Sequence, residues 1–284
     1  MPKYDDILIS LPVTRRQLFK FTYRRHLGFL FKLSMFLSLF ALPLILVYLI
    51  KGSIASDVLK EFNNENIVKY LSTEIYTDLL YIPALGIFSL GLAGSFTLMK
   101  QYVFQEGFLF LKSFFLGIKK NGKEFFIVTL IYSIIFYLIN FAKNYFAILD
   151  VSYFVLGTII SAVLLLILLC TALFSYTMIP IYKNSISRTI KNSFFFTTNK
   201  MYKIIGIALI TIVPLFIIPY INVFFVKEVA GIILGVTLLI YMLIGLGHSV
   251  LTSTLYCHHV YDELVNQDNY KELYRKGLYN EDEQ

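Results

Sequence analysis

Six long apolar stretches alternate with seven polar ones along the chain, and this pattern predicts a polytopic membrane protein. The apolar stretches cover residues 27–50, 79–99, 125–141, 152–181, 204–220 and 229–252. An α-helix rises about 1.5 Å per residue and the hydrocarbon core of a bilayer is about 30 Å thick, so a span needs roughly 20 apolar residues. We therefore predict an all-α bundle of six transmembrane helices.

The basic residues are distributed unevenly between the polar stretches. Twenty of the 25 Lys and Arg residues lie in or beside the first, third, fifth and seventh stretches. Because basic residues accumulate on the cytoplasmic side, this alternation predicts a multi-pass cell-membrane protein with both termini cytoplasmic. It divides the chain into an interfacial N-terminal segment (1–26), a six-span domain (27–256) and a cytoplasmic tail (257–284). No small-residue cleavage pattern follows the first span, so we expect it to stay as an anchor.

Composition agrees with this class. Hydrophobic residues make up 57% of the chain, charged residues 15%, and the mean hydropathy is +0.70, whereas about a quarter of a typical soluble domain is charged. The formal charge of +7 comes from residues that flank the spans. It therefore indicates attraction to the headgroups of the lipid bilayer and not to nucleic acid.

Two of the basic connections resemble each other at a constant offset of 80 residues. The run 95–102 matches 175–182 and the run 113–115 matches 193–195, while Lys120 and Lys123 match Lys200 and Lys203. Duplication of a unit of span, amphipathic helix and span explains the match, and so does chance among low-complexity apolar residues. Such repeats occur in transporters and in membrane scaffolds.

Each of these connections predicts an interfacial amphipathic helix. In 107–120 and in 184–197, apolar residues recur at three- and four-residue steps, with basic residues on the other faces. The helices either anchor the protein at the headgroups or dock a partner. The residues that would make the contact are Phe108, Leu111, Lys112, Phe115, Lys119 and Lys120 in the first, and Ile186, Arg188, Ile190 and Lys191 in the second.

Two more short helices are predicted outside the spans. Thr14 and Gln17 fit a capping box that opens a helix before the first span. The outer stretch 51–78 carries five acidic residues, and we expect a short helix there with Ser56 as its cap.

Intramembrane chemistry is sparse. Coupled transport requires charged groups within the spans, yet the six spans contain no acidic residue. His248 is the one ionisable side chain deep inside, beside Ser249 and Thr252. An interhelical hydrogen bond is the role we expect for it, with a gating or solute-binding role as the alternative.

Signals for an enzyme or a cofactor are weak. Cys257-His258-His259 precedes Asp262 and Glu263, which places two carboxylates at helical spacing from two imidazoles. One such pair supplies too few ligands for a zinc site. The chain has no phosphate-binding glycine loop and no Gly-x-Ser-x-Gly or His-Glu-x-x-His motif. We therefore expect no enzymatic activity, no cofactor and no bound metal.

The run from the second span into the third carries a family resemblance. It reads Ala93-Gly94-Ser95-Phe96-Thr97, Tyr102-Val103, Glu106-Gly107 and Phe114-Phe115-Leu116-Gly117-Ile118-Lys119-Lys120-Asn121. A small-residue span, an acidic turn and a Phe-rich helix in this order resemble the YesL-like family of bacterial membrane proteins, a domain of unknown function. The likeness covers most of residues 15–255. The outer stretch is longer than usual for the family, and the tail from Leu264 onward is extra.

The resemblance implies a six-span protein of Gram-positive bacteria with an accessory role in carbohydrate transport, because genes of the family often lie beside carbohydrate ABC importers. No binding residue is carried over. Neither connection has the Glu-Ala-Ala…Gly loop with which importer permeases contact their ATPase. We therefore expect a non-enzymatic accessory or scaffold subunit whose partners are the permease subunits of such an importer. The alternatives are a self-standing facilitator or permease for a small solute, and a membrane enzyme or metal-dependent factor that uses residues 257–263.

Overall fold

The computed structural model describes residues 12–58, 64–150, 153–211 and 227–279, and all regular elements in these ranges are helices. The helices are α2 (Arg15–Arg25), α3 (Leu27–Val58), α4 (Asn64–Asp78), α5 (Tyr81–Val103), α6 (Phe110–Leu149), α7 (Tyr153–Met178), α8 (Ile186–Asn199), α9 (Met201–Thr211), α12 (Lys227–Ile240), the π-helical turn η2 (Tyr241–Gly245), α13 (Leu246–Tyr261), the π-helical turn η3 (Asp262–Asn266) and α14 (Gln267–Asn269).

The prediction of an all-α polytopic bundle is confirmed. Five helical stretches are long and apolar enough to cross a membrane. They are Leu27–Lys51, Tyr81–Val103, Phe110–Leu149, Val155–Met178 and Gly231–Asn269. The remaining predicted span, 204–220, begins in α9 and continues outside the described residues. The count of six therefore stays a prediction.

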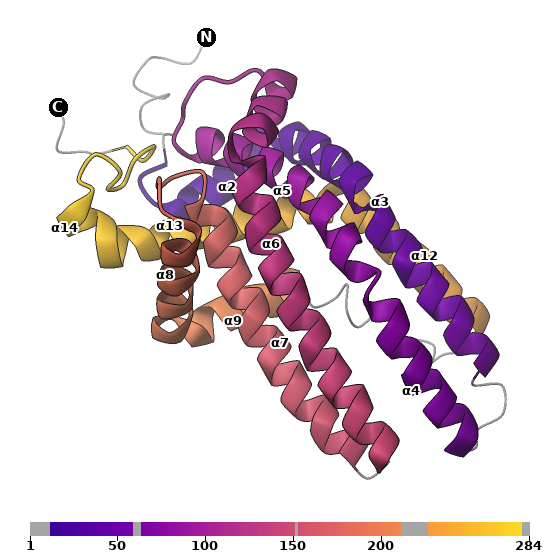
Figure 1. Ribbon diagram of the computed structural model, residues 1–284. Coiled ribbons are helices and arrows are strands. Elements are labelled where there is room, and N and C mark those ends of the chain that lie inside the picture. Colours follow the sequence, from indigo (N-terminus) through magenta and orange to yellow (C-terminus); the bar gives the residue numbers. More distant parts are fainter. Residues whose placement is uncertain (1–11, 59–63, 151–152, 212–226, 280–284) are drawn as a thin grey trace.

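The long helices lie along a common direction. Figure 1 shows α3, α5, α6 and α7 extending along the long axis, with α2, α8 and α14 gathered at one end. The two ends of the described chain meet there, because the Tyr279 amide donates a hydrogen bond to the Pro12 carbonyl at 3.0 Å. The capping box predicted for α2 is confirmed: the Thr14 side chain accepts from the Gln17 amide and the Gln17 side chain accepts from the Thr14 amide.

Two helix boundaries differ from expectation. The first span continues to Val58, so Ser56 lies inside α3 and does not cap the outer helix, which begins at Asn64. The first predicted interfacial helix is not separate from the third span either. Both belong to α6, whose 40 residues correspond to about 60 Å, roughly twice the thickness of the hydrocarbon core.

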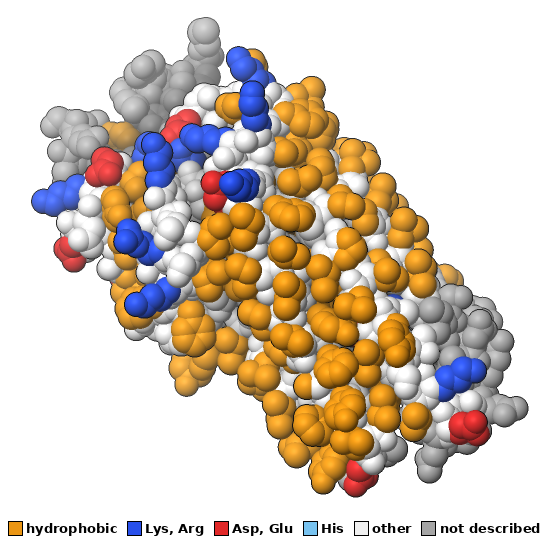
Figure 2. Space-filling model, viewed as in Figure 1, with side chains coloured by type: hydrophobic (Ala, Val, Ile, Leu, Met, Phe, Trp, Pro, Cys, Tyr) orange, Lys and Arg blue, Asp and Glu red, His pale blue; other side chains and the backbone are white. Residues whose placement is uncertain are grey.

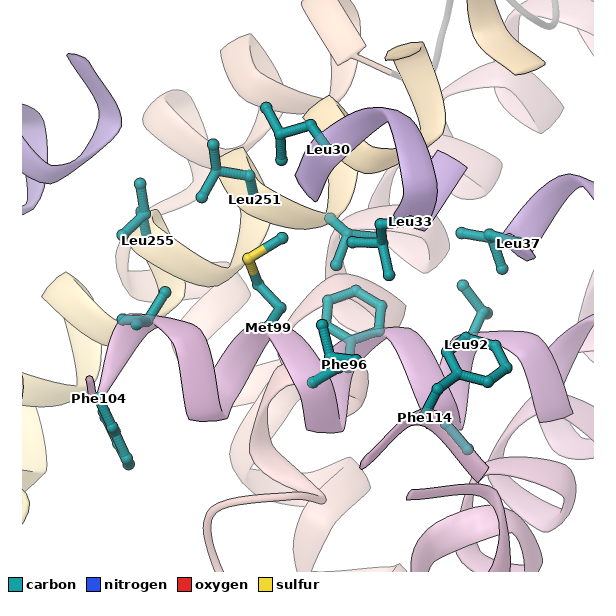
Figure 3. Packing of buried hydrophobic residues seen from close by; sticks show 14 of the residues in the cluster. Leu30, Leu33, Leu37, Leu92, Phe96, Met99, Phe104, Phe114, Leu251 and Leu255 are labelled. Atoms are coloured by element: carbon teal, nitrogen blue, oxygen red, sulfur yellow. The ribbon is translucent and has the colours of Figure 1, made fainter. Parts of the chain in front are cut away.

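The main core lies where α3, α5, α6 and α13 meet. Figure 3 shows Leu33 and Leu37 of α3, Phe96 and Met99 of α5 and other apolar side chains packed together there. A second core joins α7, α8, α9 and α13 and includes Phe174, Phe196 and Tyr261, whose rings are within 6.1 Å of one another. Because α13 contributes to both cores, it connects the two parts of the bundle.

The last helix contacts α3 at very short range. A Cβ atom on Gly247 would lie 2.5 Å from the Leu30 carbonyl oxygen, so only glycine fits. The preceding π-helical turn η2 interrupts the regular ladder of backbone hydrogen bonds. The Gly247 amide donates instead to Ser34 Oγ at 2.7 Å, and the buried donor is satisfied.

Candidate functional site at the basic end

We call the end of the bundle formed by α2, the start of α6, α8 and residues 262–279 the basic end. Figure 2 shows Lys and Arg side chains gathered over this end, with an apolar surface over the middle of the molecule. Polar contacts connect its segments. Lys276 of the tail contacts Glu106 before α6 at 3.1 Å, and Lys200 after α8 contacts Glu263 at 2.6 Å. The basic stretches that alternate along the sequence therefore lie together in space.

A buried carboxylate organises this end. Asp262 Oδ2 accepts a hydrogen bond from Arg15 Nη2 at 3.0 Å, and its Oδ1 accepts from Asn266 Nδ2 at 2.8 Å and from the Arg275 amide at 3.3 Å. Arg15 also donates to the Lys276 carbonyl at 3.0 Å. Burial lowers the pKa of Arg15, and the charge of Asp262 opposes that shift. Asp262 therefore holds both ends of the described chain, the N-terminal end through the ion pair with Arg15 and the C-terminal end through the Arg275 amide.

Residues 257–263 serve packing and ion pairing. Cys257 and His258 are buried, and the His258 ring lies 5.0 Å from the Phe104 ring. Asp262 is occupied by Arg15, and Glu263 by Lys200. No group of three or more potential metal ligands occurs among the described residues. The helical spacing that raised a metal-binding alternative thus places these carboxylates next to basic partners.

His248 contacts the N-terminal helix. Its Nδ1 atom shares a hydrogen bond with the Tyr23 hydroxyl of α2, and its ring lies 6.1 Å from the Phe19 ring in an edge-on arrangement. This is the kind of interhelical bond that we expected for His248. Its gating or solute-binding alternative stays untested.

The residues proposed for docking in the first connection fall into two groups. Phe108 is half-buried, with its ring 5.6 Å from the Phe29 ring. Exposed side chains form the second group, which consists of Leu111, Lys112, Phe115, Lys119 and Lys120. The face that packs on the bundle is a different one and contains Ser113, Phe114 and Gly117. Of the predicted apolar face, Leu111 and Phe115 therefore point outward, whereas Phe108 packs on the bundle.

The second connection divides its predicted residues in the same way. Ile186 and Ile190 are half-buried against the small core around Val128 and Ala172. Arg188 and Lys191 are exposed, as are the neighbouring Phe194 and Phe195. Phe115 and Phe195 are counterparts at the offset of 80, and each is 56% exposed.

A cavity of about 300 Å³ lies between the two connections. It is lined by Lys120, Asn121, Glu124, Val128, Ile179, Tyr182, Lys183, Asn184, Ile186 and Thr189. Lys120 and Ile186 were among the predicted site residues, whereas Glu124, Lys183 and Asn184 were not. The α6 and α8 residues of the lining are at least 58 positions apart in the sequence, so only the 80-residue offset hints that the two connections belong together.

A second polar cluster, missed by sequence reasoning, stabilises the opposite end. Lys51 of α3 contacts Asp78 at 2.5 Å and Glu74 at 3.2 Å, and Asn144 of α6 donates to Glu74 at 3.1 Å. Burial raises the pKa of Glu74, but Lys51 and Lys143 outweigh it and the net shift is downward. This cluster attaches α4 to α3 and α6, which identifies it as a structural contact.

Comparison of the chain with models of protein families, with curated proteins and with solved structures finds no match.

Proposed function

We propose that this protein is a non-enzymatic membrane scaffold whose basic end, facing the cytoplasm, docks the permease subunits of a carbohydrate ABC importer. The importer as partner rests on the resemblance to the YesL-like family. Docking at the basic end rests on the surface of α6 and α8. The cytoplasmic orientation rests on the distribution of Lys and Arg.

The main support for docking at the basic end comes from Phe115 and Phe195, which correspond at the offset of 80 residues. Each ring is 56% exposed, and each lies on a helix that also presents basic side chains outward. Large aromatic side chains are enriched at contact surfaces. An apolar patch rimmed by polar residues marks an interaction site.

The charged residues of the chain favour a scaffold over an ion-coupled transporter. Coupled transport requires charged groups within the spans, and the six predicted spans contain no acidic residue.

Affinity purification in mild detergent from the native membrane tests the proposal. The wild-type chain is compared with the double variant Phe115→Ser/Phe195→Ser and with the control Phe146→Ser, whose ring is 54% exposed at the other end of α6. We expect wild type and control to retain importer permease subunits, identified by mass spectrometry, and the double variant to lose most of them. Recovery of the protein alone from wild-type membranes would overturn the proposal.

A further inference from the structure

The cavity between the two connections has the composition of a binding site and not of a packing defect. Three elements contribute to it: α6, the turn after α7 and the first turn of α8. Seven of its ten lining residues are polar or charged, and Val128, Ile179 and Ile186 supply apolar contacts. At about 300 Å³ it is at the small end of the range for ligand pockets.

Its positive groups favour an anion. Lys120 and Lys183 both line the cavity with exposed side chains, and neither forms an ion pair within the part of the chain that the structure describes. The 14-residue helix α8 begins at the cavity, with Ile186 as its first residue. The amide groups of a first helical turn carry partial positive charge and bind phosphate.

One carboxylate oxygen in the cavity needs a donor. Glu124 Oε2 is buried and has no hydrogen-bond partner among the described residues. Leaving a buried acceptor unsatisfied is unfavourable, and more so when it is charged. A bare phosphate would meet repulsion from Glu124, whereas an ester of phosphate that carries a hydroxyl or ammonium group could donate to it. The lining therefore combines two cations for a phosphate with one acceptor for a neighbouring donor.

The cavity lies at the level where a lipid headgroup would lie. On α6 the polar run Lys119 to Glu124 ends next to the predicted span 125–141, and Lys120 and Glu124 both line the cavity. On the facing side, Ile179 and Lys183 mark the same transition just after α7. A transition from charged to apolar residues on two neighbouring helices corresponds to the membrane interface.

The lining is held in place by the rest of the basic end. The Tyr182 hydroxyl donates to Asn266 Oδ1 at 2.5 Å, and Asn266 in turn donates to Asp262. Asn121 donates to Thr97 Oγ1 at 2.8 Å. A pocket whose residues are fixed before binding loses less entropy when the ligand binds.

We propose that this cavity binds the headgroup of a phospholipid, with the phosphate at Lys120, Lys183 and the first turn of α8, and a headgroup hydroxyl or ammonium donor at Glu124. The proposal does not depend on the importer as partner, because the ligand belongs to the bilayer itself.

The test measures which lipids the purified full-length protein retains. The protein is reconstituted in mixed phosphatidylcholine and phosphatidylglycerol vesicles, extracted in mild detergent and examined by native mass spectrometry. Phosphatidylglycerol offers hydroxyl donors, whereas the choline group offers none. We expect selective retention of phosphatidylglycerol, reduced about tenfold in the double variant Lys120→Gln/Lys183→Gln, as for the loss of charge-assisted contacts.

The control variant Lys123→Gln/Lys203→Gln removes two exposed cations outside the cavity and should retain the lipid within about twofold. Equal loss from both double variants would show unspecific attraction to charge and overturn the proposal. Displacement by excess soluble glycerol phosphate would identify a free phosphate ester as the ligand and overturn its lipid source.

Two further results decide the matter independently of these lysine variants. Glu124→Ala removes the acceptor and should weaken the preference for phosphatidylglycerol over phosphatidylcholine, whereas an unchanged or stronger preference would contradict the role given to Glu124. If the lysine variants fail to fold, the wild-type protein alone suffices, because equal retention of both lipids would overturn the proposal.

Discussion

The two connections related by the offset of 80 residues differ in how closely their helices approach the bundle. In the first, Phe114 is fully buried and its ring lies 5.6 Å from the Phe36 ring. In the second, the counterpart Phe194 is 53% exposed. The first helix also continues without interruption into its span, whereas α8 ends at Asn199 before α9 begins.

Small residues explain the difference. A Cβ atom on Gly94 would lie 2.8 Å from the Phe114 ring, and one on Gly117 would lie 2.7 Å from Thr97 Cβ. At the offset of 80, Gly94 and Gly117 correspond to Phe174 and Thr197. The first helix therefore packs directly on α5, while the larger residues of the second unit fill that space with their own side chains.

The largest difference in stability should separate the alanine variants of the counterparts Phe114 and Phe194. Phe114→Ala removes a fully buried ring and should lower the free energy of unfolding by about 3 kcal/mol or more, since a cavity is left. Phe194→Ala removes an exposed ring and should change it by less than about 1 kcal/mol. Both cysteines, Cys170 and Cys257, are buried, so the onset of labelling by a thiol-reactive dye on heating reports unfolding. Equal shifts would contradict the difference between the two connections.

Filling the space at the glycines should have the next largest effect. Gly117→Ala forces a methyl group against Thr97 and should destabilise by about 1–3 kcal/mol. Gly206→Ala is the control, because a Cβ atom there meets nothing within 4 Å. Since alanine has a higher helix propensity than glycine, this variant should leave the free energy of unfolding unchanged or raise it by up to about 1 kcal/mol. The same dye measurement applies. A neutral Gly117→Ala would mean that α5 and α6 are not in close contact.

Tyr102 and Tyr182, which correspond at the offset of 80, bond to opposite ends of the described chain. Removing either hydroxyl should lower the free energy of unfolding by a smaller amount. Tyr102 shares a hydrogen bond with Thr22 of α2 at 3.0 Å, and Tyr182 donates to Asn266 at 2.5 Å. Each Tyr→Phe change should cost about 1 kcal/mol. Hydrogen exchange should quicken in α2 for Tyr102→Phe, and in residues 262–279 for Tyr182→Phe. Faster exchange in the same segment for both variants would show that the two bonds are not independent.

We expect the smallest effect at Glu106 of the first connection, which titrates, whereas Ile186 at the corresponding position of the second connection does not. Burial raises the pKa of Glu106, but hydrogen bonds from Lys100 and Lys276 outweigh it and the net shift is downward. A carboxyl group with a lowered pKa stabilises the folded state above its unfolded value, and that contribution is lost as the pH falls through the folded value. Glu106 should therefore hold the tail at neutral pH and release it below about pH 4.5, its ordinary pKa.

Hydrogen exchange of the tail around Gly277, corrected for the intrinsic rate at each pH, checks this expectation. In Glu106→Gln the additional exchange below pH 4.5 should disappear. The counterpart of Glu106 is Ile186, which does not titrate, so Ile186→Gln should leave the pH profile of the tail unchanged. An unchanged profile in Glu106→Gln would assign the pH dependence to another group.

The spans and the α2 capping box could be predicted from local patterns because each depends on residues close in sequence. Apolar runs of about 20 residues suffice for a span, and Thr14 with Gln17 suffices for the cap. The uninterrupted α6 could not be predicted in this way. It depends on contacts of Gly94 and Gly117 with residues of other elements, which amphipathic spacing within 107–120 does not contain.

The candidate site was only partly predictable for the same reason. Lys120, Ile186 and the exposed Phe115 follow from helical spacing, but the cavity needs two connections to meet. Arg15 and Asp262 are separated by 247 positions, and no local pattern pairs them. The spacing of His258 and Asp262 suggested that both bind one metal ion, whereas in the fold Asp262 forms an ion pair with Arg15.

Cross-linking from the exposed face of α8 tests most directly whether the basic end docks a partner. A photoreactive phenylalanine analogue replaces Phe195, and separately the control Phe146, in native membranes that contain the carbohydrate importer. The expected result is a covalent adduct with an importer permease subunit from position 195 and none from position 146. Adducts with lipid alone from position 195, or the same protein adduct from both positions, would contradict docking at this surface.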